Sequence, residues 1–272
     1  MKNLIARTLT GIIFITVILS AIYIHPFWFA GVFTAITGLL INEFYSLTGY
    51  KNRSWNRLLG VAAGMYLFLA SLLYAGNYCG KAIFFPYILS ILILFAAELY
   101  HKEQNPVRQW GIHSVAQIYC AVSLSFLCFI PYIENQQYNP SLLAVIFVFI
   151  WLNDTSAYLT GSRWGKHRLF KRISPLKSWE GFIGGFVVVL IASQIFAGYF
   201  TFMARYEWLL FAIITVVAAT FGDLTESLLK RACGAKDSGN ILPGHGGILD
   251  RLDSAIFVSP PVYIFLEIIT RN

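Results

Sequence analysis

The sequence predicts an all-α polytopic membrane protein with about nine transmembrane helices. Of its 272 residues, 57% are hydrophobic and only 12% are charged, which is about half the charged fraction of an ordinary soluble domain. The apolar residues also form blocks long enough for a helix to cross the hydrocarbon core. These blocks are far too long for the strands of a membrane barrel, and only helices or closed barrels satisfy their backbone in lipid.

The apolar blocks predict spans at residues 9–25, 27–48, 58–75, 82–100, 112–132, 141–160, 180–202, 207–229 and 252–270. Short connections join them, so residues 1–272 are expected to form a single integral-membrane domain. Its N-terminal spans lie within 1–140, and 141–272 is the predicted catalytic half. The first block follows Lys2 and Arg7 as a signal peptide would, but it is long for one and no Ala-x-Ala pattern follows it. We expect it to be retained.

The basic residues predict the orientation of the spans. With the N-terminus in the cytoplasm, all of the 20 Lys and Arg except Lys81, Arg205 and Arg271 fall on inner segments, as the positive-inside rule requires. The C-terminus then lies outside, and in a bacterium the protein would occupy the cytoplasmic (inner) membrane. This positive charge needs no nucleic-acid partner, because orientation and contact with anionic lipid account for it.

Acidic residues are unusual within or at the edge of a span, where charge is costly and commonly functional. We single out seven of them: Glu43, Asp154, Glu180, Asp223, Glu226, Asp250 and Asp253. Under the predicted topology all seven fall at the membrane face that carries the basic loops. A cation transporter would instead spread its acids across the membrane depth, so this class is disfavoured.

The eighth predicted span carries a polar side at helical spacing, formed by Asp223, Glu226, Ser227 and Lys230. Asp250 and Asp253 are three residues apart and share one side of the ninth span. A hairpin of the two spans would bring these carboxylates together, and Mg²⁺ is the natural cation to hold them beside phosphates. Pairing of Asp250 or Asp253 with Lys230 or Arg251 is the alternative that the spacing leaves open.

A glycine-rich segment, Pro243-Gly-His-Gly-Gly247, precedes the ninth span. Residues without a Cβ allow backbone amides to approach an anion, and the N-terminus of the following helix adds its dipole. His245 fits two roles equally, a general acid or phosphate donor and a structural hydrogen-bond partner. Acids, glycine backbone and basic side chains in one place are typical of phosphoryl or nucleotidyl transfer.

A second polar loop lies between Asp154 and Gly181. Ser174 and Pro175 are expected to form the turn that starts the seventh span, with Glu180 and Gly181 in its first turns. The loop is rich in cationic side chains: Lys166, His167, Arg168, Lys171 and Arg172. Trp179 suits either a nucleotide base or an interfacial anchor.

Two blocks resemble the signature of the phosphatidate cytidylyltransferases, or CDP-diacylglycerol synthases. The first reads Ser227-x-x-Lys230-Arg231-x4-Lys236-Asp237 and continues as Pro243-Gly-His-Gly-Gly247-x-x-Asp250-Arg251-x-Asp253. The second reads Asp154-Thr-x-Ala-Tyr-x-x-Gly161 and continues as Ser174-Pro-x-Lys177-Ser-Trp-Glu-Gly181, where Ser178 replaces a commoner threonine. The first 140 residues share only the pattern of hydrophobic spans.

The resemblance implies the reaction of CTP with phosphatidate to give CDP-diacylglycerol and pyrophosphate in phospholipid biosynthesis. The phosphatidate phosphate would attack the α-phosphate of CTP at the cytoplasmic interface, with Mg²⁺ as cofactor and room for a second cation. Anionic lipid and a second copy of the chain are further expected partners. The rivals are a CTP-using polyprenol kinase, a synthase for archaeal ether lipids and an inactive membrane scaffold.

The resemblance also assigns the site. The metal ligands would be Asp223 and Asp250, with Asp154 and Asp253 as weaker candidates. The catalytic residues would be Asp223, Asp250, Lys230, Arg231 and His245. Substrate-binding residues would be Ser174, Lys177, Glu180, Ser227, Lys236, Asp237, Gly246, Gly247, Arg251 and Asp253.

Overall fold

The structure is a computed structural model that describes residues 2–50, 54–100, 105–134, 136–241 and 246–271. Its long helices are α1 (Lys2–Ile24), α2 (Pro26–Leu47), α3 (Ser54–Ala75), α4 (Phe85–Ala97), α7 (Ser141–Trp164), α8 (Trp179–Tyr199), α9 (Arg205–Ala232) and α10 (Leu249–Arg271). The fifth predicted span is built from α5 (Pro106–Val115), the π-helical η3 (Ala116–Val122), α6 (Ser123–Ser125), η4 (Phe126–Cys128) and η5 (Ile130–Tyr132).

The helices confirm the predicted fold class. Within the described residues, eight helical segments are long and apolar enough to cross a membrane, and the apolar stretch of α1, Thr8–Ile24, is a shorter ninth. The short helices η1 (Lys81–Phe84) and η2 (Glu98–Tyr100) extend α4 at its two ends. The apolar side chains that cover these helices are therefore the ones expected to face lipid.

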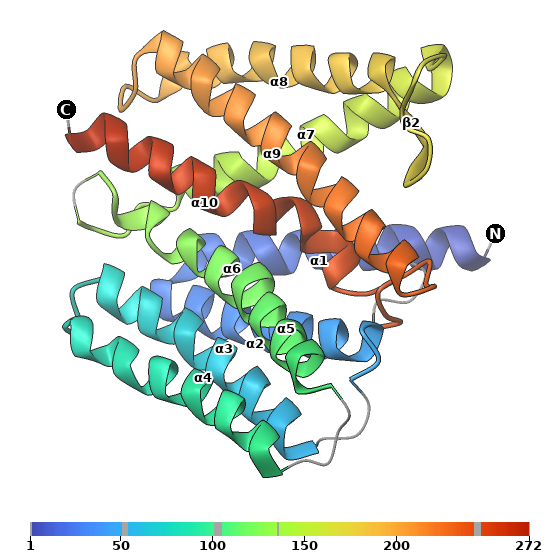
Figure 1. The fold of residues 1–272 in the computed structure, drawn as a ribbon. Helices are drawn as coiled ribbons and strands as arrows, with labels where there is room; N and C mark the ends of the chain where they lie inside the picture. The colour runs from blue at the N-terminus through green and yellow to red at the C-terminus, as the bar shows by residue number, and fades with distance from the viewer. Residues whose placement is uncertain (1, 51–53, 101–104, 135, 242–245, 272) are drawn as a thin grey trace.

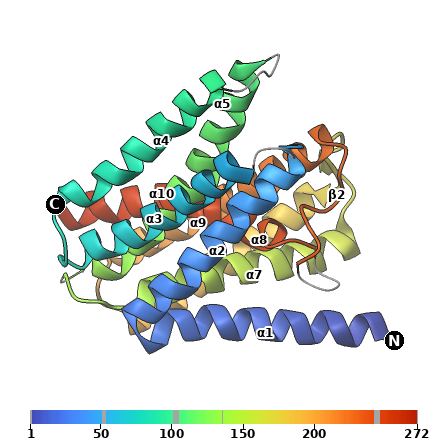
Figure 2. The ribbon, with the colours of Figure 1, turned by 90° about the horizontal axis from the view of Figure 1, so that it is seen from below.

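The helices pack as one bundle with the two chain ends at opposite ends of it (Figure 1). Helices α7, α8, α9 and α10 pack on one another in the C-terminal half, and α2 packs on α3 and η3 in the N-terminal half. Helix α1 lies along one side of the bundle, and α4 with α5 projects from the other (Figure 2). The described residues between α9 and α10 lie at the same end as the N-terminus (Figure 1).

A β-hairpin joins α7 to α8, which the sequence did not predict. Strands β1 (Arg168–Phe170) and β2 (Ser174–Ser178) pair antiparallel, with Arg168 opposite Ser178. Ser174 and Pro175 therefore belong to a strand, and their assignment to a helix-start turn was wrong. The Ser178 hydroxyl accepts a hydrogen bond from the Gly181 amide at 3.1 Å, so the helix begins after Ser178 instead.

Candidate active site

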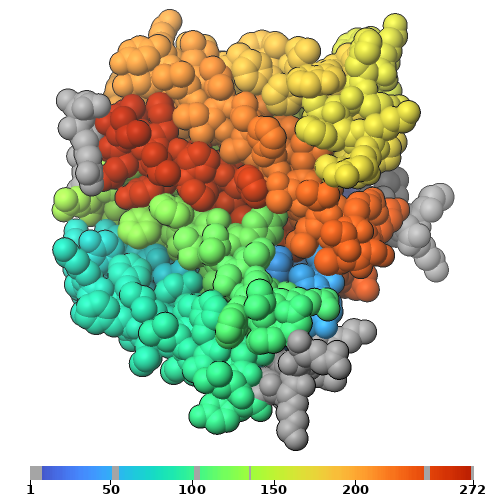
Figure 3. Space-filling view, viewed as in Figure 1, coloured from blue at the N-terminus to red at the C-terminus, as the bar shows by residue number. Residues whose placement is uncertain are grey.

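The predicted site residues come from α7, β2, α8, α9 and α10 and from the residues before α10, which meet at the end of the bundle near the N-terminus (Figure 1). Asp154 lies on α7, Lys177 on β2 and Asp223 on α9. Residues 233–241 and 246–248 and the first turns of α10 complete this end. On the molecular surface the hairpin (yellow) lies against the end of α9 (orange) (Figure 3). The two signature blocks, separated by more than 40 residues of apolar sequence, are thus neighbours in space.

Asp223 is the acid that the hairpin reaches. The Lys177 ammonium forms an ion pair with its carboxylate, and about a third of each side chain is exposed, 29% for Lys177 and 34% for Asp223. The Ser227 hydroxyl donates to Asp223 Oδ1 at 3.3 Å from the next helical turn. The predicted polar side of this span is therefore present, and strand β2 supplies a cation to it.

Further carboxylates surround this ion pair. Asp253 on α10 interacts electrostatically with Asp223, Glu226 and Asp154. Its side chain is buried, as is that of Glu226, whereas Asp154 is exposed. The backbones of α9 and α10 approach closely at Gly222, where an added Cβ would lie 2.6 Å from the Asp253 carbonyl oxygen. The α9–α10 hairpin therefore brings the acids of both spans together as expected.

Lys230 joins the two spans through a pair of carboxylates. Its ammonium lies 2.5 Å from Glu226 Oε2 and 2.6 Å from Asp250 Oδ1. Both carboxylates are nearly inaccessible to solvent, with 1% of the Glu226 side chain and 8% of the Asp250 side chain exposed. Asp250 therefore pairs with Lys230 in this structure, which is the alternative that the sequence left open.

The second oxygen of Asp250 binds backbone amides of the residues that precede α10. Asp250 Oδ2 accepts hydrogen bonds from the amides of Gly247 (2.7 Å) and Ser238 (3.0 Å) and lies 3.0 Å from the Ser238 hydroxyl. Gly246 adopts a φ of 83°, and a Cβ there would collide with Asp250. The Gly247 amide, expected at a triphosphate, donates to a protein carboxylate instead, so an anion would have to displace Asp250 to reach it.

Glu43 is a site component that the sequence marked as unusual but did not place. It lies on α2, is 4% exposed, and accepts hydrogen bonds from the amides of Ile248 (3.0 Å) and Leu249 (2.9 Å). The Ser238 hydroxyl lies 3.2 Å from Glu43 Oε2 and donates either to Glu43 or to Asp250. The sequence indicated a role for Glu43 only by placing an acid in an apolar span. Its hydrogen-bond partners lie 195 to 206 residues away along the chain, so no local pattern could identify them.

Several predicted residues lie at the edge of this group. Arg231 donates to the Ala235 carbonyl at 3.2 Å. Arg231, Lys236, Asp237 and Arg251 are exposed, whereas Ser174 is partly buried in β2. Glu180 accepts from the His167 ring at 2.7 Å and from the His167 amide, so it ties the hairpin to α8. His245, with Pro243 and Gly244, lies outside the described residues.

Two buried oxygen atoms in this group have no hydrogen-bond partner among the described residues. The Tyr119 hydroxyl and Glu226 Oε1 are buried, and no described residue forms a hydrogen bond with either. Tyr119 interacts electrostatically with Asp253, Glu226 and Asp223. It belongs to the π-helical η3, a distortion often found at functional sites. An aromatic residue in an apolar span gave no signal of this placement.

The donor set suits a hard cation that is completed by substrate. The group has carboxylates from Asp154, Asp223, Glu226, Asp250 and Asp253, and its cations are Lys177, Lys230 and Arg251. When all are ionised, negative charge is in excess. Among the described residues, no three His, Cys, Asp or Glu side chains are close enough to hold a metal by themselves. Mg²⁺ needs no such cage, because one or two carboxylates, water and phosphate oxygens complete its shell.

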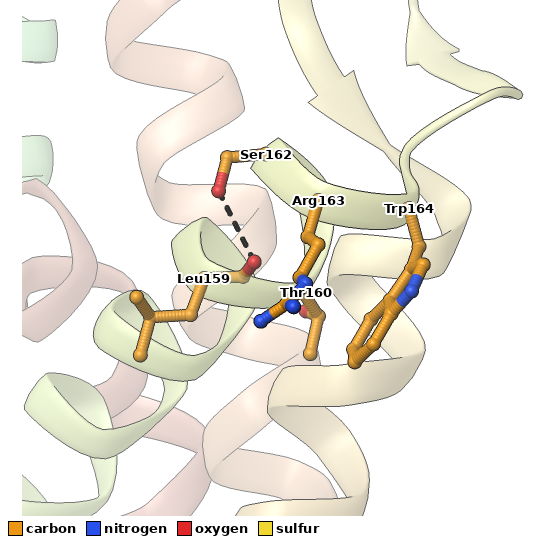
Figure 4. A pocket seen from close by; sticks show the side chains of 5 residues that line it. All are labelled: Leu159, Thr160, Ser162, Arg163 and Trp164. Carbon is orange, nitrogen blue, oxygen red and sulfur yellow. Dashed lines mark hydrogen bonds between the residues drawn. The ribbon is translucent and has the colours of Figure 1, made fainter.

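A hollow of about 550 Å³ lies at the end of α7 (Figure 4). It is lined by Leu159, Thr160, Ser162, Arg163 and Trp164, and the Ser162 hydroxyl donates to the Leu159 carbonyl at 3.1 Å. None of the acids described above lines it. Arg163 and Trp164 are residue types that anchor helix ends at a membrane interface, so this hollow is not assigned to the chemistry.

The fold and this group of charges define a multi-pass membrane protein with acidic and basic side chains gathered at one end of its helices. Residues 5–269 match the cytidylyltransferase family. The chain belongs to this family and is therefore a nucleotidyltransferase.

Curated relatives extend over nearly the whole chain. The phosphatidate cytidylyltransferase of Bacillus subtilis is 33% identical over 272 residues, covering 98% of this chain and 99% of the relative. That of Haemophilus influenzae is 30% identical over 279 residues, covering 93% and 95%. The enzyme of the same name from Staphylococcus saprophyticus is 42% identical over 153 residues, covering 54% and 58%.

Proposed function

We propose that this chain is a CTP:phosphatidate cytidylyltransferase that forms CDP-diacylglycerol and pyrophosphate for phospholipid biosynthesis. One observation carries the proposal: the Lys177–Asp223 ion pair joins one signature block to α9, the helix on which the other block begins, inside a group of acids at one end of a membrane-spanning bundle. The names of the relatives in Bacillus subtilis and Haemophilus influenzae supply the substrate.

The position of the site suits substrates from two phases. Phosphatidate is confined to the bilayer, whereas CTP is dissolved in the cytoplasm, so a shared site must lie at the membrane interface. The charged group lies at an end of the bundle, between apolar helices and the polar hairpin. We assign this end to the cytoplasmic face of the cytoplasmic membrane, where the basic hairpin would also meet anionic headgroups.

The chemistry requires charge neutralisation more than covalent catalysis. A phosphate oxygen of phosphatidate attacks the α-phosphorus of CTP, the bond from this phosphorus to the β-phosphate oxygen breaks, and pyrophosphate leaves. Lys177 and Lys230 lie among the acids, and the exposed Arg231, Lys236 and Arg251 surround them. These cations would hold the phosphates and lower the repulsion between two anionic substrates.

A Mg²⁺ ion would be held by Asp223, with Asp154 and Asp250 as the other candidate ligands. Asp223 and Asp154 are the more accessible of the three, whereas Asp250 already accepts several hydrogen bonds. When bound, the ion would neutralise triphosphate charge. The buried, unpartnered Glu226 Oε1 and Tyr119 hydroxyl are oxygen donors that a second cation would use.

The test is an assay of purified protein in detergent with α-labelled CTP and phosphatidate, with Mg²⁺ or with EDTA. Wild type should form labelled CDP-diacylglycerol only with Mg²⁺, and Asp223→Asn should lose this activity. Glu134→Gln, which alters an exposed acid hydrogen-bonded to Asn139, should retain it. A folded wild-type protein that forms no lipid-linked cytidylate from phosphatidate would refute the proposal, and polyprenol and ether-lipid acceptors would be tried next.

A further inference from the structure

The N-terminus of α10 is occupied by carboxylates of the protein itself. A helix begins with amides that have no partner within the helix, and a buried helix end must satisfy them elsewhere. Here the Gly247 amide donates to Asp250, and the amides of Ile248 and Leu249 donate to Glu43. A negative charge at this end also complements the helix dipole. The position where a phosphate would commonly bind is therefore filled by Glu43, from the opposite half of the chain.

Two glycines before α10, Gly239 and Gly247, leave space for the Glu43 carboxylate. A Cβ on Gly239 would lie 2.7 Å from Glu43 Oε1, and a Cβ on Gly247 would collide with both the Glu43 carboxylate and the Ser238 hydroxyl. Real Cβ atoms essentially never come so close, so any larger residue would displace the carboxylate or the loop. Close approach of a protein carboxylate is thus a sufficient reason for glycine at both positions.

Helix α2 holds Glu43 on a fixed support. Directly before Glu43, the Asn42 carboxamide and carbonyl accept hydrogen bonds from Arg57 of α3, each at 2.8 Å. Two residues after Glu43, the Tyr45 hydroxyl lies 2.9 Å from Nδ1 of His113 on α5, and both side chains are buried. Helix α2 is therefore held by two other helices on either side of Glu43, so the backbone of Glu43 has a support that is separate from the residues its carboxylate binds.

Ser238 links Glu43 to the charged group. Its hydroxyl lies between the Glu43 and Asp250 carboxylates, at 3.2 Å and 3.0 Å, and its amide donates to Asp250. Asp250 in turn receives the Lys230 ammonium at 2.6 Å. A shift of the Glu43 carboxylate would therefore move Ser238 and the start of α10, and with them Asp250 and Lys230.

We infer that Glu43 is a positioning residue for the nucleotidyl transfer: it fills the anion position at the N-terminus of α10 and fixes Asp250 and Lys230 where the substrates meet them. The inference rests on the proposed function for the reaction that is positioned. It also implies that the triphosphate is held by basic side chains and not by the amides of Gly247, Ile248 and Leu249.

The first test is hydrogen exchange of wild type and Glu43→Gln, followed in a peptide that covers residues 246–252. Glutamine has nearly the shape of glutamate, but its NH₂ group would face an amide donor, so the α10 amides lose protection. Exchange in this peptide should accelerate about tenfold or more, and Glu43→Asp should restore part of the protection. Glu207→Gln is the matched control, because the Glu207 carboxylate accepts a hydrogen bond from the Ala204 amide at the start of a different helix, α9.

The second readout is steady-state kinetics of the same variants. Glu43→Gln should lower kcat by about 10-fold to 100-fold through misplaced catalytic groups, with little change in KM, because Glu43 touches neither substrate. If Glu43→Gln does not fold, Gly239→Ala perturbs the same carboxylate from the loop side.

Each outcome decides a separate claim. Unchanged exchange in the 246–252 peptide, or acceleration of the same size in Glu207→Gln, would refute the claim that Glu43 caps the N-terminus of α10. Faster exchange with wild-type kcat would refute positioning. A wild-type protein that is inactive with CTP and phosphatidate would refute the proposed reaction, and with it the claim that Glu43 positions the catalytic groups. The exchange experiment would still test whether Glu43 caps the N-terminus of α10.

Discussion

Single side chains in the site are mostly engaged with one another. Lys177 binds Asp223, and Lys230 lies between Glu226 and Asp250. An exposed ion pair contributes little to stability, whereas removing one member of a buried pair leaves an uncompensated charge. The partly exposed Lys177–Asp223 pair can therefore open to substrate at small cost, and the buried Lys230–Asp250 pair is better suited to hold the structure of the site.

Lys177→Ala should lower kcat/KM by about 100-fold to 1,000-fold, because the hairpin would no longer deliver a cation to the phosphates. Lys171→Ala is the matched control on the same hairpin, since Lys171 is exposed at its turn. Steady-state assays of both variants decide the point. Equal activity of Lys177→Ala and Lys171→Ala would show that the basic hairpin acts only through its overall charge.

Asp223→Asn and Asp250→Asn should differ in stability although both lose activity. Asp250→Asn disrupts a buried ion pair and the bonds to Ser238 and Gly247, so its free energy of unfolding should fall by about 3 kcal/mol. Asp223→Asn should cost less than about 1 kcal/mol, because Asp223 is a third exposed. Thermal unfolding in detergent measures both, and a reversed order would contradict the roles given to these two acids.

Among the elements, the α9–α10 hairpin and the β-hairpin build the site from opposite sides. The first brings the acids of two spans together through the close contact at Gly222. The second carries Lys177 to Asp223 and is tied to α8 by Glu180 and His167. The positions of the spans followed from apolar block length, but the β-hairpin did not, because its strands are three and five residues long and lack an alternating apolar pattern.

Gly222→Ala should separate α9 from α10. The new Cβ would lie 2.6 Å from the Asp253 carbonyl oxygen and 3.0 Å from Phe257 Cβ, so both stability and activity should fall, the stability by about 1 to 3 kcal/mol. Gly31→Ala, on α2, meets nothing within 4 Å and is the control. Unfolding temperatures and turnover of the two variants test this, and wild-type behaviour of Gly222→Ala would contradict the close contact.

In the whole molecule, the polar groups are divided unequally between the two ends of the bundle. The charged group, the hairpin and the α9–α10 segment share the end of the N-terminus, and the C-terminus lies at the other end (Figure 1). An odd number of crossings places the termini this way. Basic residues at the end of the site predict that it faces the cytoplasm.

Native cysteines provide a test of this orientation. Cys79 is exposed between α3 and α4, and Cys233 is partly exposed at the end of α9, whereas Cys120 and Cys128 are buried. A membrane-impermeant maleimide should label Cys79 in intact spheroplasts and Cys233 only in inverted vesicles. Mass spectrometry of the labelled peptides, with Cys79→Ser and Cys233→Ser as controls, reads the result. Labelling of Cys233 from outside would reverse the predicted topology.

Composition and block length were enough to predict the membrane class and the bounds of most helices to within a few residues, because the bilayer imposes one length and one hydrogen-bonding rule on every span. Helical spacing likewise placed Asp223 and Ser227 on one side of α9, since such contacts are local. Only the tertiary structure brought Lys177 to Asp223, turned Asp250 toward Lys230 and Ser238, and set Glu43 at the start of α10. These contacts join residues up to 206 positions apart, and which of several neighbouring charges pair is decided by packing between helices, which no local pattern encodes.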